Sequence, residues 1–252
     1  MSAVIVIPAR YDSTRFPGKP LAPLKGKPII QHVFENSRNA RAAEDVIVAT
    51  DSETIFERVS SFGGKAVMTS SDHVSGTDRV AEVAALLHCD IIVNVQGDEP
   101  LIRPWMIDDA VGLLTDERAH IGTLVKKIVN PEEVVDPNVV KVVFDGDGFA
   151  LYFSRSPIPY HRDEWKELST FSVQRSSFLV FKHIGIYAYR RDVLLKLTRM
   201  KPSKLEEREK LEQLRALENG VRIKVKETST ETIGVDTPQD LERVERWLNL
   251  SS

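Results

Sequence analysis

Short apolar runs alternate with amphipathic stretches through the first half of the chain. Runs rich in Val and Ile, which favour β-strands, lie at 3–8, 45–50, 65–68 and 90–95. Apolar residues recur at helical spacing between them, at Ile29, Ile30, Val33 and Phe34, and again at Val80, Val83, Ala84 and Leu87. Each of these helices would turn an apolar stripe onto a sheet. The alternation predicts an α/β fold whose mostly parallel sheet is covered by helices on both faces.

The alternation becomes less regular after about residue 115. Strands are expected at 122–128, 139–144, 149–153 and 183–189, and the sequence DGDG at 145–148 marks a turn. The stretch 160–177 is polar and charged, and we interpret it as a surface loop or lid. The second half therefore predicts a smaller, mixed part of the fold.

The last helix of the chain has a clear start signal. Thr237 suits the N-cap, Pro238 the first helical position and Asp240 the first turn. The residues expected on its buried face are Leu241, Val244, Trp247 and Leu248. Asp236, directly before the cap, is expected at the end of a strand.

Composition narrows the class of protein. The 252 residues carry 34 Lys and Arg against 37 Asp and Glu, so no general basic field would attract nucleic acid or an anionic membrane. No apolar run approaches the ~20 residues that cross a bilayer, and the N-terminus enters a strand pattern without a signal-peptide layout, so we expect a soluble cytoplasmic protein. The single cysteine, Cys89, is expected to be a structural thiol.

A cationic loop follows the first predicted strand. Arg10, Arg15 and Lys19 lie within ten residues that are rich in Pro and Gly, with Asp12 as the one acidic neighbour. At the carboxyl end of a strand, where ligands of such sheets collect, these cations indicate a multiply charged phosphate ligand rather than a solvated basic loop. The stretch lacks G-x-x-x-x-G-K-[ST] and G-x-G-x-x-G, which argues against a kinase-type nucleotidase and a nicotinamide dehydrogenase.

Many ordered sequence blocks resemble those of the sugar-acid cytidylyltransferases. The opening block is PARYDSTRFPGKPL, followed by GKPII. Further blocks are VATD (48–51), MTSSDHVSGTDR (68–79), NVQGDEP (94–100), NVVKVVFD (138–145), ALYFSRSPIPY (150–160), HIGIYAYR (183–190), LEQLRALENG (211–220) and GVDTPQDLERVE (234–245). Asp12, where the family has a small residue, and residues 161–181 depart from the pattern.

This resemblance implies a Rossmann-like nucleotide-binding sheet flanked by helices, with a smaller mixed α+β part. Within a single nucleotidyltransferase domain, 1–115 would be the nucleotide-binding half. Residues 116–230 would bind the sugar acid and form a homodimer interface, and 231–252 would close the fold. Relatives of this family are usually homodimers.

Two acidic residues are candidate metal ligands. Asp98 follows the strand at 90–95, and Asp236 comes from a distant part of the sequence. Carboxylates that converge on a polyphosphate need a cation between them, and Mg²⁺ suits hard oxygen ligands. Each residue alone could be a turn or capping aspartate. The resemblance favours metal ligation by Asp98 and Asp236 and leaves Glu99 less certain.

The resemblance also implies residues that contact the nucleotide. Arg79 lies at a helix start, where a cation is unfavourable for the helix dipole, so a ligand contact is an alternative to a surface Arg. Together with Arg10, Arg15 and Lys19, the expected nucleotide-binding residues are Pro8, Ala9, Ser13, Ser75, Gly76, Arg79 and Gln96.

The sugar-acid contacts implied by the resemblance lie in the second half of the chain. Glu209 and Gln213, four residues apart, are expected on one helix face, with an ordinary solvated face as the alternative. His183 and Tyr187 are expected on one side of a strand, away from Ile184 and Ile186. The implied set is Arg155, His183, Tyr187, Glu209 and Gln213.

The implied reaction transfers CMP from CTP to the anomeric hydroxyl of 3-deoxy-D-manno-octulosonate (Kdo), releasing pyrophosphate for lipopolysaccharide biosynthesis. Catalysis would depend on positioning and charge neutralisation, with Arg10, Arg15 and Lys19 on the triphosphate and Asp98 and Asp236 on Mg²⁺. Two alternatives stay open: a cytidylyltransferase for sialic acid or an amino-modified Kdo, and a non-catalytic nucleotide-binding protein.

Overall fold

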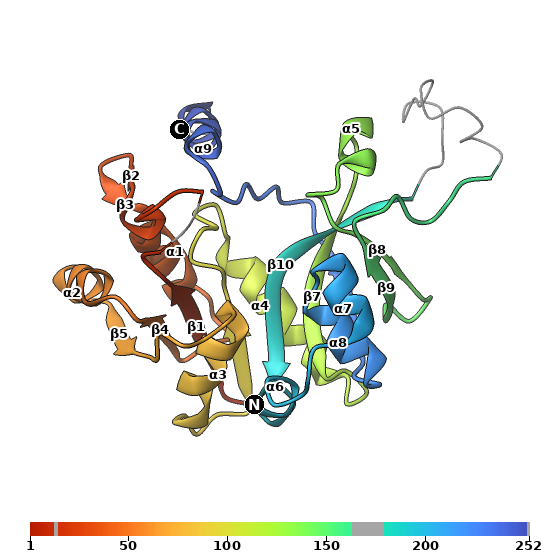
Figure 1. Cartoon of the computed structure of the whole chain (residues 1–252), viewed down its shortest axis with the longest axis horizontal. Helices are drawn as coiled ribbons and strands as arrows, with labels where there is room; N and C mark the ends of the chain where they lie inside the picture. Colours follow the sequence, from red (N-terminus) through yellow and green to blue (C-terminus); the bar gives the residue numbers. More distant parts are fainter. Residues whose placement is uncertain (13–14, 163–178, 251–252) are drawn as a thin grey trace.

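The computed structural model describes residues 1–12, 15–162 and 179–250. Its main sheet runs in the order β11 (Ile223–Glu227), β7 (Ile121–Lys127), β10 (Phe181–Arg190), β6 (Ile91–Asn94), β1 (Ala3–Ala9), β4 (Asp45–Thr50) and β5 (Lys65–Met68). The hairpin of β8 (Lys141–Phe144) and β9 (Ala150–Ser154) is attached to β10. Helices cover both faces of this sheet (Figure 1). The α/β fold predicted from the sequence is confirmed.

The first half forms the parallel part of the sheet. All seven residues of β1 are buried, as expected for a strand covered on both faces. β1 pairs in parallel with β4 and β6, and β4 pairs in parallel with β5. The bounds, close to those predicted, are β1 (Ala3–Ala9), β4 (Asp45–Thr50), β5 (Lys65–Met68) and β6 (Ile91–Asn94).

The second half adds a mixed part to the same sheet. β10 runs antiparallel to β6, β7 and β8, so it joins the two halves. The predicted strands are present as β7 (Ile121–Lys127), β8 (Lys141–Phe144), β9 (Ala150–Ser154) and β10 (Phe181–Arg190). The predicted loop at 160–177 falls almost wholly outside the described residues. The sequence pattern missed β11 (Ile223–Glu227) and the short β2 (Pro23–Leu24) and β3 (Lys27–Pro28).

Two apolar layers hold the helices against the sheet. One packs α1 (Ile29–Arg38), α2 (Glu53–Ser61), α4 (Pro104–Gly112) and α9 (Pro238–Leu250) against one face. The other packs α3 (Gly76–Ala85), α6 (Arg191–Leu197), α8 (Gln213–Glu218) and the β8–β9 hairpin against the opposite face. The remaining helices are short: α5 (Pro131–Val135), α7 (Lys204–Glu209), and the 3-10 turns η1 (Lys19–Leu21) and η2 (Leu113–Thr115).

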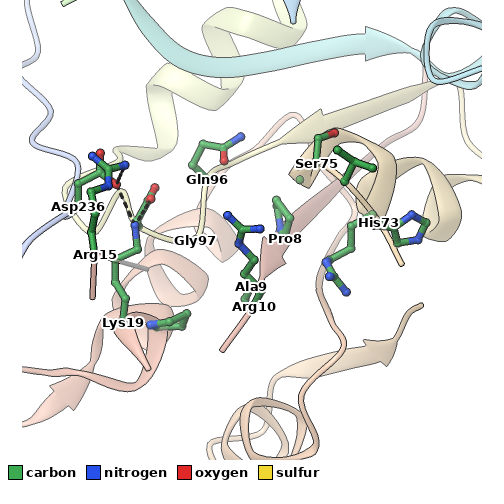
Figure 2. Close-up of a pocket in the computed structure, with 15 residues that line it drawn as sticks. Pro8, Ala9, Arg10, Arg15, Lys19, His73, Ser75, Gln96, Gly97 and Asp236 are labelled. Atoms are coloured by element: carbon green, nitrogen blue, oxygen red, sulfur yellow. Dashed lines mark hydrogen bonds and ion pairs between the residues drawn. The ribbon is translucent and has the colours of Figure 1, made fainter. Parts of the chain in front are cut away.

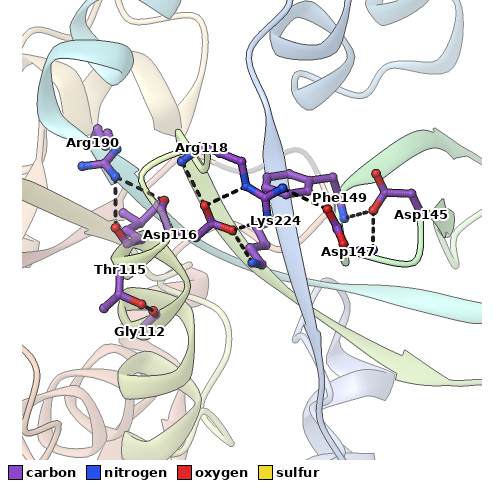
Figure 3. A network of polar contacts seen from close by, with 10 residues as sticks. Gly112, Thr115, Asp116, Arg118, Asp145, Asp147, Phe149, Arg190 and Lys224 are labelled. Atoms are coloured by element: carbon purple, nitrogen blue, oxygen red, sulfur yellow. Dashed lines mark hydrogen bonds and ion pairs between the residues drawn. The ribbon is translucent and has the colours of Figure 1, made fainter.

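A charged network closes the edge of the sheet where β7 and β11 begin (Figure 3). Asp116 accepts hydrogen bonds from Arg118 at 2.9 Å and from Lys224 at 2.6 Å. These two cations hold the pKa of Asp116 far below its ordinary value. The Arg118 guanidinium also lies over the Phe149 ring, 5.1 Å from its centroid. The network ties β7, β11 and the turn before β9 together at the end of the sheet away from the strands' carboxyl ends.

The final helix begins as predicted, but the segment before it does not. The Thr237 hydroxyl accepts a hydrogen bond from the Asp240 amide at 3.3 Å, and α9 starts at Pro238. Asp236 was expected at a strand end. It lies instead in an extended segment, 228–237, that leads from β11 past the end of β6 to α9 (Figure 1). The Val235 amide donates to the Asp98 carbonyl at 2.9 Å, which fixes Asp236 beside the end of β6 without a strand.

Among the described residues, none of the helices combines the length and hydrophobicity that crossing a bilayer requires.

Candidate active site

A polar cleft opens at the carboxyl ends of β1 and β6 (Figure 2). It contains about 920 Å³ of open space, part of it continuous with solvent. Its walls come from the loop after β1, the loop before α3, the loop after β6 and the segment before α9. The lining residues are Pro8, Ala9, Arg10, Arg15, Lys19, Pro20, His73, Val74, Ser75, Gly76, Arg79, Gln96, Gly97, Asp98 and Asp236.

Two glycines shape the backbone around this cleft. Gly18 has a left-handed φ of 68°, and its amide donates to the Tyr11 carbonyl at 2.9 Å, which closes the cationic loop just before Lys19. A Cβ atom on Gly97 would lie 2.7 Å from the Pro8 carbonyl oxygen. Only glycine therefore lets the loop after β6 approach the end of β1 so closely.

The cations and carboxylates predicted from the sequence meet in this cleft (Figure 2). The Lys19 ammonium lies 2.5 Å from an Asp98 oxygen and 3.2 Å from an Asp236 oxygen. Arg15 contacts the same Asp236 oxygen at 3.1 Å. Arg10 lines the cleft and is exposed. The structure thus brings together residues that lie 217 positions apart in the chain.

Glu99 lies behind these two aspartates. Burial raises its pKa to about 8, and the charges of Asp98 and Asp236 contribute to the same shift. Its Oε2 atom is buried and has no hydrogen-bond partner among the described residues. Three carboxyl groups therefore lie close together at one end of the cleft, with Lys19 balancing the two outer ones.

The donor set fits a magnesium ion. No cluster of three or more His, Cys, Asp or Glu side chains suited to a metal occurs in the described part of the chain. Mg²⁺ in nucleotide sites uses one or two carboxylates, and substrate phosphates and water supply its other ligands. Asp98 and Asp236 provide that number, and their oxygens already converge on one cationic group.

The loop before α3 forms the opposite wall of the cleft. The Ser75 hydroxyl caps α3 by accepting from the Asp78 amide at 3.2 Å. Gly76 packs next to the Pro8 ring, and a Cβ atom there would lie 3.4 Å from Pro8 Cγ. Gln96 donates to the Asn94 side-chain oxygen at 3.1 Å and faces the cleft. Ser75, Gly76 and Gln96, which the sequence predicts as nucleotide contacts, therefore all line the cleft.

Arg79 is placed differently from a surface arginine. Its side chain is buried and donates to Asp51 at 2.6 Å, to the Thr69 hydroxyl and to the Ser70 carbonyl at 3.3 Å. Arg79 still lines the cleft, but Asp51 balances its charge. It therefore holds the loop before α3 in place as well as lining the cleft.

One pair in this wall escaped the sequence prediction. His73 lines the cleft, and its Nε2 atom contacts a Glu82 oxygen that also accepts from the Ser70 amide at 3.0 Å. His73 belongs to the MTSSDHVSGTDR block, but nothing in the spacing links it to Glu82, because the two approach one another only when α3 folds back along the loop.

A second pocket lies next to the cleft, over β10. Gly76 and Gln96 line both, so the two spaces adjoin. Of the predicted sugar contacts, Arg155, His183, Tyr187 and Gln213 line this pocket, together with Lys210 and Glu212, which the sequence prediction did not include. His183 and Tyr187 lie on the same side of β10 as predicted, with ring centroids 5.0 Å apart. Burial lowers the pKa of His183 to about 3, so its ring is neutral.

The prediction that Glu209 and Gln213 share one helix face is wrong. Glu209 ends α7, Gln213 begins α8, and Lys210 between them has a left-handed φ of 55°. Glu209 is not among the residues lining the pocket. Its carboxylate accepts from the Ser154 hydroxyl at 2.7 Å and from the Arg155 amide at 2.9 Å. Glu209 therefore ties α7 to the end of β9.

The Arg155 guanidinium makes its hydrogen bonds to backbone carbonyls. It donates to the carbonyl oxygens of Glu209 at 2.7 Å, Pro137 at 2.8 Å and Lys210 at 3.4 Å. Below it, the fully buried Lys141 ammonium donates to three carbonyls, among them that of Arg155 at 2.6 Å. Arg155 thus shapes the pocket wall in addition to bordering the ligand space.

Pro8, Ala9 and Ser13 are the remaining residues that the sequence predicts as nucleotide contacts. Pro8 and Ala9 line the cleft at the end of β1. Ser13 lies outside the described residues.

The fold, the cleft and these sequence blocks define a nucleotidyltransferase. A cytidylyltransferase family profile matches residues 4–223, and the chain belongs to that family. The chain is 55% identical over 245 residues to a 3-deoxy-manno-octulosonate cytidylyltransferase of Geobacter sulfurreducens, covering 97% of this chain and 98% of that protein. It is 52% identical over 260 residues to the protein of that name in Thermodesulfovibrio yellowstonii, with both chains covered completely.

A solved structure agrees with these relatives. A CMP:2-keto-3-deoxy-manno-octonic acid synthetase complexed with CTP superposes with a TM-score of 0.91 at 44% sequence identity, over the full length of both chains. A 4-diphosphocytidyl-2C-methyl-D-erythritol synthase superposes with a TM-score of 0.63 at 12% identity, which shows the shared fold alone.

Proposed function

We propose that this cytidylyltransferase transfers CMP from CTP to the anomeric hydroxyl of Kdo, forming CMP-Kdo and pyrophosphate. The main support for the proposal is that Arg15 and Lys19 contact Asp98 and Asp236 in one cleft. A pocket lined by His183, Tyr187 and Gln213 lies directly beside this cleft. The names of the relatives and of the CTP-bound structure support the choice of substrates.

In the proposed mechanism the chain positions two substrates and neutralises charge. Arg10, Arg15 and Lys19 bind the triphosphate, and Lys19 exchanges part of its contact with Asp98 and Asp236 for phosphate oxygens. Asp98 and Asp236 would hold Mg²⁺, which supplies charge neutralisation at the phosphates when bound. The sugar acid lies over β10, so that its anomeric hydroxyl approaches the α-phosphate in line with the departing pyrophosphate.

No described side chain is required as a dedicated base. The lowered pKa of His183, about 3, makes its neutral ring a weak base, and Glu209 is committed to Ser154 and to the Arg155 amide. The proposed rate enhancement therefore comes from orientation and preorganised charge, as in other phosphoryl transfers. We further propose that the enzyme works in the cytoplasm as a homodimer and supplies lipopolysaccharide biosynthesis.

The substrate is tested by comparing sugar acids under one set of conditions. Purified protein is given CTP with Kdo, an amino-modified Kdo or a sialic acid, and the CMP–sugar formed is quantified by chromatography. We expect kcat/KM to be highest with Kdo. A higher value for another sugar acid would assign the chain to that substrate, and CTP binding without any CMP–sugar would identify a non-catalytic nucleotide-binding protein.

A further inference from the structure

The hydroxyl group of Thr123 lies where β10 departs from regular pairing with β7. The register between the two strands shifts between Ile184 and Tyr187, and Thr123 lies opposite Tyr187. The Thr123 side chain is fully buried, and its Oγ1 atom has three neighbours. These are the Ile186 carbonyl at 2.6 Å, His183 Nε2 at 2.9 Å and the Ile184 carbonyl at 3.3 Å. The hydroxyl therefore lies within reach of two backbone carbonyls at the bulge, but its single proton can satisfy only one of them.

A hydroxyl has one proton to donate, which decides the direction of these bonds. An oxygen–oxygen separation of 2.6 Å is repulsive without a shared proton, so the Thr123 hydroxyl donates to the Ile186 carbonyl. The Thr123 oxygen is then an acceptor toward His183. Because two lone pairs would otherwise face each other at 2.9 Å, His183 Nε2 carries a proton and donates it to Thr123.

The surroundings of His183 fix the ring in this orientation and keep it neutral. Its backbone amide donates to the Val140 carbonyl at 2.9 Å. Phe153 meets the ring edge-to-face at 5.3 Å between centroids, and Tyr187 packs at 5.0 Å. No carboxylate contacts the ring among the described residues, and burial lowers the pKa of His183 to about 3. A neutral imidazole with a proton on Nε2 has a free lone pair on Nδ1.

We propose that Thr123 is a positioning residue that fixes His183 as the neutral Nε2–H tautomer, so that His183 Nδ1 accepts a hydrogen bond from a hydroxyl of the sugar acid. The inference rests on the proposed function for the identity of that ligand. His183 lines the sugar pocket, and its Nδ1 atom has no hydrogen bond to any described residue. Thr123 itself is fully buried and does not line the pocket.

This arrangement makes His183 a selective recognition group. A neutral acceptor favours a ligand hydroxyl and disfavours a carbonyl or ether oxygen at the same point, since neither can donate. It also leaves His183 without a positive charge toward the sugar carboxylate. Selection by a buried acceptor is strong because a ligand that lacks the donor leaves the acceptor unpaired.

The tautomer is tested directly on the free wild-type protein by nitrogen-15 NMR of the imidazole rings. The chain has 6 histidines, and the spectrum of His183→Gln identifies the signals of His183 by their loss. We expect a neutral ring at neutral pH with a protonated Nε2 and an unprotonated Nδ1, whose shift changes when Kdo is added. A proton on Nδ1, or a doubly protonated ring, would overturn the inference whether or not the enzyme turns over Kdo.

Kinetics of two matched variants test the role of Thr123. Thr123→Val keeps the shape and removes the hydroxyl, whereas Thr123→Ser keeps the hydroxyl. We expect Thr123→Val to raise KM for Kdo about tenfold, the scale of one lost hydrogen bond. KM for CTP should stay within about twofold of the wild-type value. Thr123→Ser, which keeps the hydroxyl, should have a KM for Kdo close to that of wild type.

The outcomes separate this inference from the proposed function. An unchanged KM for Kdo in a folded Thr123→Val, or equal rises in KM for both substrates, would overturn the role of Thr123. Should Thr123→Val not fold, the tautomer spectrum of the wild type and of Thr123→Ser decides. Absence of CMP–sugar formation by the wild type would instead refute the proposed function and leave the tautomer measurement standing.

Discussion

At the scale of single residues, Lys19 is the side chain on which the charges of the cleft converge. Its ammonium contacts both Asp98 and Asp236 and is itself well covered, with 13% of the side chain exposed. Without it, the carboxylates of Asp98 and Asp236 would repel each other. Lys19 therefore keeps the acidic end of the cleft assembled before the nucleotide arrives.

Replacing either aspartate tests the predicted metal ligands. Asp98→Asn and Asp236→Asn keep the side-chain size and remove the negative charge that would hold Mg²⁺. We expect kcat to fall about a hundredfold or more, the scale of losing a preorganised electrostatic group, with the melting temperature retained. Asp109→Asn serves as the control, because Asp109 pairs with Lys226 on the surface away from the cleft. Turnover near that of wild type in both variants at saturating Mg²⁺ would contradict the assignment.

At the scale of elements, the α7–α8 turn depends on a pair that joins its two helices. Arg215 in α8 donates from Nε to Glu206 in α7 at 2.7 Å, and Glu206 also completes a capping box with Ser203. Burial by itself would raise the pKa of Glu206. The hydrogen bonds from Arg215 and from the Ser203 amide lower the pKa by more than burial raises it, so the net shift is downward. The turn between these helices places Lys210, Glu212 and Gln213 at the second pocket.

Removing the Glu206 carboxylate is expected to loosen this turn. Glu206→Ala leaves Arg215 without its counter-charge, and we expect the free energy of unfolding in urea to fall by about 3 kcal/mol. Because the folded-state pKa is lowered, the stabilisation is complete above the ordinary value of 4.5 and is lost as pH falls through the folded value. The difference from wild type should therefore persist at neutral pH and shrink below pH 4.5. The exposed Glu207→Ala is the control, and an equal loss in both variants would refute the role of the pair.

The segment 228–237 is a second element that the site depends on. Glu231 contacts Lys182 at 2.8 Å and Lys126 at 3.1 Å, and these pairs anchor the segment to β10 and β7 five residues before Asp236. Glu231→Gln is expected to lower kcat about tenfold by misplacing Asp236, without contact to substrate. Glu227→Gln, at the exposed end of β11, is the matched control. A kcat equal to that of the control would show that the anchor does not position Asp236.

The element scale also shows what the sequence could predict. Continuous apolar runs were sufficient to predict β1, β4 and β6, because parallel strands buried on both faces have such runs. The short run KAVM also predicted β5, although this edge strand is only partly buried. The pairing of Glu209 with Gln213 failed because helical spacing was assumed across Lys210, whose left-handed backbone ends α7. The placement of Asp236 beside β6 follows from one backbone hydrogen bond to Asp98, which no local pattern signals.

At the scale of the whole molecule, the sheet order brings the cleft and the second pocket together. β1 and β6, which end at the cleft, are neighbours, and β10, which carries His183 and Tyr187, pairs with β6. Gly76 and Gln96 then border both spaces. Binding at either space therefore acts on strands that belong to one continuous sheet.

Nucleotide binding should accordingly stabilise the whole fold. CTP with Mg²⁺ at about a hundredfold its Kd is expected to add about 2.7 kcal/mol to the free energy of unfolding. For a chain of this size that corresponds to a rise in melting temperature of about 5 to 10 °C, measurable by scanning fluorimetry. ATP at equal concentration is the control for base recognition. An equal rise with ATP would mean that the cleft holds the triphosphate without selecting the base.

The most direct test of the account is pyrophosphate release from CTP and Kdo, measured with Mg²⁺ and again after the divalent ions have been chelated. The account predicts rapid release that requires both substrates and falls about a hundredfold or more on chelation, because Asp98 and Asp236 need the cation to face a triphosphate. Release at an unchanged rate without divalent ions, or none with both substrates and Mg²⁺ present, would contradict it.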